Sequence, residues 1–341
     1  MNVPSKVVLG LCFIALSGLS GCGSDEDPGP SGRLVQGPVL NATVFADNVS
    51  GGTRFVQDAN EVSTTTNSVT GAFTLPSVPG YNYILVSKGG TDKLTGQDAI
   101  QMIAPAGSAN ITPLTTLVAL DTTNTVKAKL QALMPAGVSY DADISVTSSQ
   151  AVLLVAKSVE TMVQTMTEAI SAKAGANTIS EDQLAAIQAQ TVQAIAVEFA
   201  KPAVNSTTLA APADLSTTLQ TAAAGAVTSI NTANANISIP SATATTIAAS
   251  SVTATAGALS IGATASTSTI AGGEAAVMTE QVAQAFTDAV ETQSAVAATS
   301  ITADKTPDSY TPPTIPVVTP ITVPDTTGTT GGTTGGTGVA F

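Results

Sequence analysis

The spacing of apolar residues changes once along the chain, near residue 115, and this change constrains the fold more than any other feature. Before it, short runs such as residues 41–46 and 81–87 alternate apolar and polar positions and are separated by Gly and Pro turns. Alternation with a period of two is typical of half-buried strands. After residue 115, apolar residues recur every three or four positions, which is the period of an amphipathic helix. The sequence therefore predicts an α+β fold, with a small β-sandwich followed by an Ala/Thr-rich helical bundle.

Helix boundaries are indicated by capping and breaking residues. We expect one helix from about residue 115 to 134, ended by Pro135, and a second capped by Ser148. Ser180 with Gln183 forms a capping box for a third. A fourth follows Pro212, and the last carries the stripe Met278, Val282, Phe286, Ala289 and Val296. Residues 241–270 fit either a weakly ordered segment or a long Ala-rich helix.

Residues 1–21 have the features of a signal peptide. Lys6 supplies a positive charge, and residues 7–18 form an apolar stretch that is too short to span a bilayer but has the length of a signal core. The stretch ends in Leu19, Ser20, Gly21 and Cys22, a sequence that resembles the bacterial lipobox. The resemblance implies cleavage before Cys22, a diacylglycerol on its thiol and an acyl chain on its amine.

The implied lipid predicts where the protein resides. Two or three acyl chains hold a protein stably on a membrane, whereas one chain does so only marginally. The lipobox implies the bacterial cell envelope. Gly23 follows the cysteine in place of the Asp that retains many lipoproteins at the inner membrane, so we expect the outer membrane.

Charge excludes several classes of partner. Only Lys6 of the 11 Lys and Arg residues precedes Cys22, so 10 remain against 24 Asp and Glu, a net charge of −14. Phosphate backbones repel such a chain, which excludes nucleic-acid binding. Anionic membrane surfaces repel it too, so the membrane contact depends on the lipid anchor.

The residue types also restrict chemistry. The chain has no His, and its two cysteines are Cys12, removed with the signal, and Cys22, which is lipidated. Disulfides, imidazole catalysis and ordinary zinc, haem or iron–sulfur sites are therefore not expected. An enzyme would have to work with carboxylates alone. Neighbouring acidic residues occur as Asp58 with Glu61, Asp141 with Asp143, and Glu181 with Asp182. A hairpin turn, a loop and a helix first turn explain these pairs better than catalysis does, and we predict that the protein is not an enzyme.

Calcium is the one metal that the sequence suggests, because it binds carboxylate and amide oxygens. The candidate ligands are Asp47, Asn48, Asp58, Asn60 and Glu61. They lack the every-second-residue spacing of a calcium loop, so solvated turn residues are the preferred interpretation.

A further pattern is carried by residues 37–44 (GPVLNATV), 70–76 (TGAFTLP) and 83–86 (YILV). These segments resemble the carboxypeptidase-regulatory-like domain, a transthyretin-like or Cna-B-like β-sandwich. The continuation, in residues 89–92, 104–107 and 112–117 (TPLTTL), is similar to a run in large bacterial surface lipoproteins, and the resemblance covers roughly residues 32–120. The resemblance implies a spacer or binding module rather than a catalyst.

These features predict a domain order and a function. A tether occupies residues 22–31, the β-sandwich 32–92, a mainly helical domain 93–302, and a disordered Pro/Thr/Gly-rich tail 303–341. We expect a lipid-anchored envelope protein with a structural or adhesive role, whose partner is another envelope protein or a glycan. One alternative is a lipoprotein that binds a glycan, a peptide or calcium. Another is an envelope hydrolase that uses carboxylates only.

Overall fold

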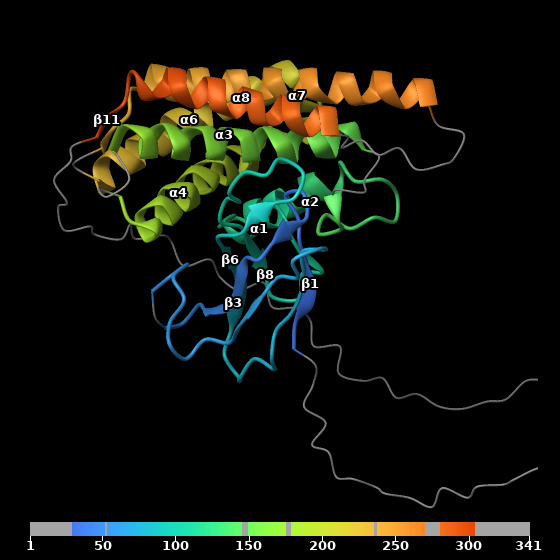
Figure 1. The fold of residues 1–341 in the computed structure, drawn as a ribbon, viewed down its shortest axis with the longest axis vertical. Coiled ribbons are helices and arrows are strands. Elements are labelled where there is room, and N and C mark those ends of the chain that lie inside the picture. The colour runs from blue at the N-terminus through green and yellow to red at the C-terminus, as the bar shows by residue number, and fades with distance from the viewer. Residues whose placement is uncertain are drawn as a thin grey trace, which may run out of the picture.

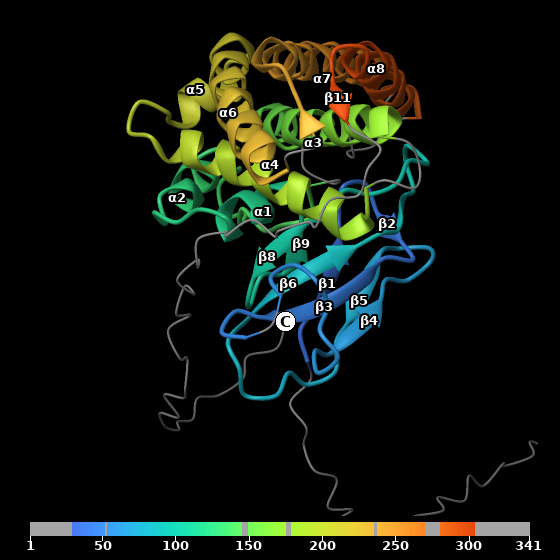
Figure 2. The same ribbon diagram turned by 90° about the vertical axis from the view of Figure 1, so that its left-hand side faces the viewer.

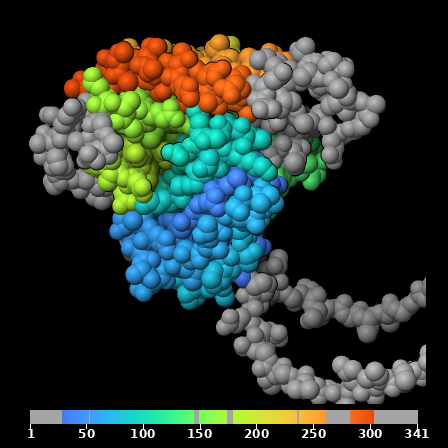
Figure 3. Space-filling model, viewed as in Figure 1, coloured from blue at the N-terminus to red at the C-terminus, as the bar shows by residue number. Residues whose placement is uncertain are grey.

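The structure is a computed structural model that describes residues 29–51, 53–144, 149–174, 179–234, 237–269 and 280–303. Nine strands come first and helices follow, which confirms the α+β prediction (Figure 1). The strands gather at one end of the body and the helices at the other, as the space-filling view also shows (Figure 3). Ser148, the predicted signal peptide with its lipobox, and the predicted tail from residue 304 onward lie outside the described residues.

Two sheets and a short strand pair make up the β part. The antiparallel four-stranded sheet has the order β4 (Ser63–Thr65), β3 (Thr43–Asn48), β6 (Tyr83–Lys88), β8 (Ile103–Pro105). The three-stranded sheet has the order β5 (Ala72–Thr74), β1 (Ser31–Leu34), β9 (Asn110–Ile111), with β1 and β9 parallel. The pair consists of β2 (Val39–Leu40) and β7 (Thr91–Asp92).

The sheets share one hydrophobic core with the helices. Leu34 of β1, Phe45 of β3 and Leu85 of β6 are fully buried, and they belong to the same core cluster as Val155 and Phe199 from the helices. Strands β8 and β9 complete the two sheets, so the β part reaches Ile111, beyond the boundary at residue 92 that the sequence suggested. The two parts therefore form one body.

The helices stack in layers above the sheets (Figures 1 and 2). Their bounds are α1 (Pro113–Ala119), α2 (Val126–Gln131), α3 (Gln150–Ala174), α4 (Glu181–Ala200), α5 (Ser206–Ala210), α6 (Pro212–Ala233), α7 (Ser241–Thr269) and α8 (Glu280–Ala298). Helix α3 is central, because it packs against α1, α4, α7 and α8. Helices α7 and α8 form the layer farthest from the sheets. In the part described, no helix is both long and apolar enough to cross a membrane.

Some helix boundaries follow the sequence and one does not. The capping box of Ser180 and Gln183 begins α4 as predicted. The single helix expected over residues 115–134 is wrong, because α1 and α2 are separate. Asp121 separates them, since its carboxylate accepts the N–H groups of Thr123 and Val126, both at 2.8 Å. That side chain replaces the backbone acceptors that a continuous helix would offer.

The ambiguous segment is the long helix α7. Its hydroxyl side chains donate to backbone carbonyls one turn earlier, as Ser251 does to Ile247 at 2.8 Å and Thr253 to Ala249 at 3.0 Å. These bonds satisfy the hydroxyls inside a helix, so alternation of Ala and Thr does not require a strand.

A cluster of threonines joins the β part to the first helix. Thr112 and Thr115 form a capping box at the start of α1. The hydroxyl of Thr115 donates to the carbonyl of Ile103 at 3.1 Å, and the hydroxyl of Thr116 accepts the N–H of Ile103 at 2.9 Å. Both threonines are buried. The backbone of β8 is thus bonded directly to helix α1.

We expect Thr116→Val to lower the free energy of unfolding by about 1 to 3 kcal/mol, because the buried N–H of Ile103 loses its acceptor. The variant keeps the shape of the side chain but not its hydroxyl. Urea unfolding followed by circular dichroism measures the loss. Thr116→Ser, which retains the hydroxyl, is the matched control and should lose less. Equal stability of the Val variant and the wild type would show that this bond is unimportant.

Candidate functional site

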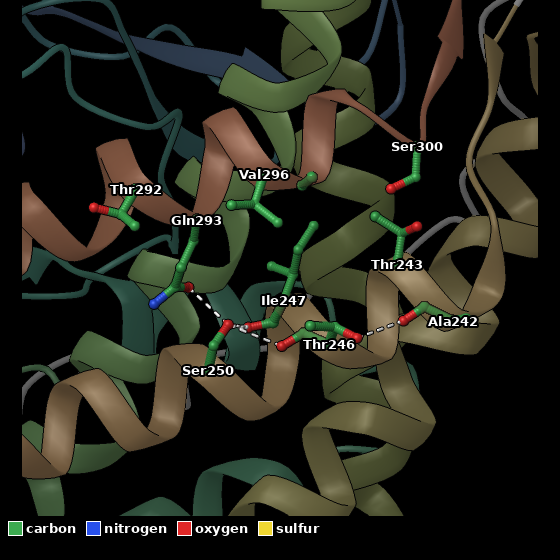
Figure 4. Close-up of a pocket in the computed structure, with 10 residues that line it drawn as sticks. Ala242, Thr243, Thr246, Ile247, Ser250, Thr292, Gln293, Val296 and Ser300 are labelled. Atoms are coloured by element: carbon green, nitrogen blue, oxygen red, sulfur yellow. Dashed lines mark hydrogen bonds between the residues drawn. The ribbon is translucent and has the colours of Figure 1, made fainter.

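An apolar groove of about 370 Å³ lies between α7 and α8 on the layer farthest from the sheets (Figure 4). Its two walls are Ala242, Thr246 and Ser250 on α7, and Gln293, Val296 and Ser300 at the end of α8. Ile247 and Ala297 also line it and are only 2% and 4% exposed. The groove is therefore open to solvent on its outer side, and the hydrophobic core closes its floor.

Small side chains explain why a groove forms here. Ala242, Thr246 and Ser250 are spaced four apart and so lie on one face of α7, where they fill little space. Val296 stands at the opposite rim and is 63% exposed. The apolar stripe that predicted the last helix includes Val296, and α8 does extend past this residue, although Met278 of the stripe lies outside the described residues. Val290 and Ala297 are buried, and Val296 is rotated about 100° away from Ala297 around the helix.

The groove is suited to apolar binding and not to acid–base chemistry. None of the residues that line it is ionisable. Its polar atoms are already partly paired, since Ser250 donates its hydroxyl to Oε1 of Gln293 at 2.9 Å (Figure 4). An apolar groove with a few polar groups is the usual form of a ligand or peptide site.

The acidic residues of the β3–β4 hairpin serve its backbone. Glu61 accepts the N–H of Asn48 at 2.7 Å with one oxygen and the N–H of Asp58 at 2.9 Å with the other. Asp58 accepts the N–H of Thr53 at 3.0 Å. Asn60 is exposed. These bonds favour the turn interpretation of the acidic residues, because their oxygens already bind N–H groups.

Asp47 is the one fully buried acid of this hairpin. It accepts the N–H of Phe55 at 3.0 Å, and Arg54 Nη1 lies 3.7 Å from the same oxygen. Gln101 donates to the carbonyl of Phe55 at 3.0 Å, so the backbone of Phe55, with a φ of 66°, is held on both sides. Burial raises the pKa of Asp47 to about 6, although the N–H of Phe55 and the charge of Arg54 oppose the rise.

Three of the five candidate calcium ligands, Asn48, Asp58 and Glu61, share hydrogen bonds, whereas Asp47 faces the positive charge of Arg54. Within the described ranges, no group of three or more acidic or cysteine side chains is placed to hold a metal ion. Calcium binding stays a prediction from the sequence.

The other two acidic pairs connect the β part to the rest of the chain. Asp141 accepts the N–H of Ala109 at 2.9 Å, and Asp143 forms an ion pair with Arg33 of β1. Lys88 of β6 lies 3.4 Å from Glu181 and 3.1 Å from Asp182 at the start of α4. These ion pairs contribute little to stability individually. In the part of the chain described, none of the three acidic pairs is arranged around a cleft.

A buried ion pair in α3 was not anticipated from the sequence. Lys157 and Glu160 have side chains only 2% and 6% exposed, and Lys157 Nζ lies 2.9 Å from Oε1 of Glu160. Lys157 also lies 5.7 Å from the ring centroid of Phe286 on α8. Burial raises the pKa of Glu160 to about 7, the charge of Lys157 opposes this, and the charge of Asp92 adds to it. In the sequence, the pair is visible only as a Lys and a Glu three residues apart in a predicted helix. The structure adds that this helix is covered on every side.

Comparison with protein-family models, with characterised proteins and with solved structures finds no match to the chain. The resemblance of residues 37–86 to the carboxypeptidase-regulatory-like domain therefore stays a prediction. A function for the chain has to be inferred from its own geometry.

We expect Asp47→Asn to reduce the pH dependence of stability. Burial raises the pKa of Asp47 in the folded protein from 3.8 to about 6. The protonated carboxyl therefore makes its full contribution to the free energy of unfolding below about pH 4, and this contribution is lost as the pH rises through 6. A tenfold change in a proton equilibrium is about 1.4 kcal/mol, so the loss is on the order of 2 to 3 kcal/mol. Urea unfolding between pH 4 and 7 measures it. Asn60→Ala, a change in the same hairpin without a titrating group, should keep the wild-type fall. An unchanged fall in the Asp47 variant would contradict the assignment.

The buried pair in α3 should behave as a unit. Lys157→Met alone leaves Glu160 buried without its cation and should cost about 3 to 5 kcal/mol. Adding Glu160→Met removes both charges and should restore most of that stability, because Met also packs well beside an aromatic ring such as Phe286. Chemical unfolding of the two single variants and the double variant tests this. Simple addition of the two single losses would count against it.

Proposed function

We propose that the protein is a lipid-anchored interaction protein of the bacterial cell envelope, and that the α7–α8 groove is its binding surface. The observation that carries the proposal is the uncharged, apolar character of this groove, with Val296 exposed at its rim. An apolar groove between two helices is a usual form of peptide- or protein-binding site.

The position of the groove supports the proposal. The first described residues bond to the β part, where the carbonyl of Pro30 accepts the N–H of Leu75 at 2.8 Å. Cys22 precedes Pro30 by only eight residues. Helices α7 and α8 lie at the opposite end of the body (Figures 1 and 2). A lipid on Cys22 would hold the β part toward the membrane and direct the groove away from it, toward a partner.

The acidic residues support a binding role over hydrolysis. Each carboxylate of the three acidic pairs takes part in a backbone hydrogen bond or an ion pair. None lines the groove. An apolar segment of an envelope protein suits this surface better than a glycan, because the hydroxyl groups of Thr246 and Ser250 are already hydrogen-bonded within the protein.

The anchor is tested by metabolic labelling in the native bacterium. With an alkyne fatty acid, we expect the wild-type chain to incorporate label and to fractionate with membranes. Cys22→Ser should abolish both. Cys12→Ser, which changes the other cysteine of the chain, is the matched control and should retain both. Label in the Cys22 variant would refute the anchor.

The groove is tested by complementing a deletion strain. We expect Val296→Asp to reduce surface attachment of the bacterium to the level of the deletion, because a carboxylate placed at the rim must be desolvated when the partner binds. Val69→Asp is the matched control, since Val69 is 61% exposed but lies in the β part. Both proteins must be present at wild-type amounts. Wild-type attachment by the Val296 variant would argue against the groove as the binding surface.

A further inference from the structure

The groove lies at the point where the chain leaves the helical layer. Ser300 lines the groove, Ile301 is 1% exposed, and β11 (Thr302–Ala303) then pairs with β10 (Ile237–Ser238). Strand β10 closely precedes α7, whose first turns form the other wall. The described chain therefore ends close to the open groove, and residues 304–341 follow it in the sequence.

One run within those residues has the chemistry of the groove. Residues 311–324 (TPPTIPVVTPITVP) contain five prolines and no charged residue, between Asp308 and Asp325. Polyproline II repeats every three residues. At that period one face of the run is wholly apolar, and it consists of Pro312, Ile315, Val318, Ile321 and Pro324.

We propose that residues 311–324 bind in the α7–α8 groove of the same chain as a polyproline II segment, with Ile315 and Val318 of its apolar face against Ile247 and Val296. The inference rests on the proposed role of the groove as a binding surface, and it identifies the first occupant of that surface. A partner would then have to displace this segment.

The lengths are compatible. The groove extends from Ala242 to Ser250, a rise of eight helical steps or about 12 Å. Polyproline II rises about 3.1 Å per residue, so four or five residues of the run fill it. Seven residues separate Ala303 from Thr311, and the eight extended steps between these two residues reach about 25 Å. The connection is long enough to turn back along the groove.

The polar atoms of the groove also suit such a segment. Polyproline II has no internal hydrogen bonds, so its carbonyls need outside donors. Gln293 and Ser250 lie in the groove and bond to each other at 2.9 Å, and the amide of Gln293 can donate to a bound segment. A short tether gives an effective concentration in the millimolar range, so weak contacts are enough to fill the groove.

Cysteine crosslinking in the full chain tests the proposal. In a Cys12→Ser, Cys22→Ser background, Val296→Cys is combined either with Val318→Cys or with Thr333→Cys. Thr333 lies in the Thr/Gly repeat, and its position doubles the length of chain between Ala303 and the introduced cysteine. This greater length by itself lowers the crosslinking rate about threefold. We expect the Val318 pair to close at least ten times faster under mild oxidation. A ratio of three or less overturns the proposal, and so does crosslinking between chains in place of within one chain.

A second measurement uses the reactivity of a thiol introduced by Val296→Cys. Added Val318→Asp places a charge on the apolar face, and it should raise the alkylation rate of that thiol about tenfold. Added Val317→Asp is the matched control on a different face and should leave the rate nearly unchanged. Equal rates in the two variants overturn the proposal. The role of the groove in binding an external partner is tested separately by the Val296→Asp strain. Normal attachment of that strain would contradict the external role and would leave the crosslinking and alkylation results unaffected.

Discussion

The hydroxyls of Thr115 and Thr116 bond to both backbone groups of Ile103, and the rest of the architecture depends on this junction. Ile103 belongs to β8, the edge of the four-stranded sheet, and the threonines open the first helix. Since both partners are buried, water cannot replace these bonds. The sheets and the helices therefore move as one body. The groove on α7 and α8 therefore keeps a constant distance and direction from strand β1, as the proposed membrane-anchored binding role requires.

The chain carries a net charge of −13, and several of its acidic side chains accept backbone N–H groups, as Glu61 does twice and Asp121 does at the start of α2. A carboxylate is a strong acceptor, and in loops with few backbone partners it fixes the chain at low cost in buried area. These acidic residues therefore contribute to loop structure.

The fold class and several boundaries were predictable because periodicity and capping act locally. Ser180 and Gln183, for example, bond to each other within the first turn of α4. The failures come from long-range or side-chain effects. Asp121 ends α1 through side-chain bonds that periodicity does not register. Strands β8 and β9 are too short to show alternation, and pairing with β6 and β1 defines them.

The candidate site was less predictable than the fold. Val296 continues an apolar spacing, but only the packing of Val290 and Ala297 against the core shows which face of α8 is buried. The small residues of α7 leave the groove open, and in the sequence they are indistinguishable from the other Ala, Ser and Thr of that helix. Lys157 and Glu160 resemble an ordinary exposed pair until the neighbours of α3 are known.

The two-residue pairing of β10 with β11 has a mechanical consequence for a protein held at its start. Tension applied between the proposed lipid anchor and the far end of the chain would load this strand pair, which joins Ile237 to Ala303 and Ser238 to Thr302. So short a ladder has few bonds to share the load, whereas at the other end β1 pairs with β5 over three residues and also with β9 over two. Under load the β10–β11 pair would separate first, and α8 would then detach from α3. The molecule would lengthen while the sheets stay intact. Helix α8 would thus act as a yielding element that protects the β part from being pulled apart.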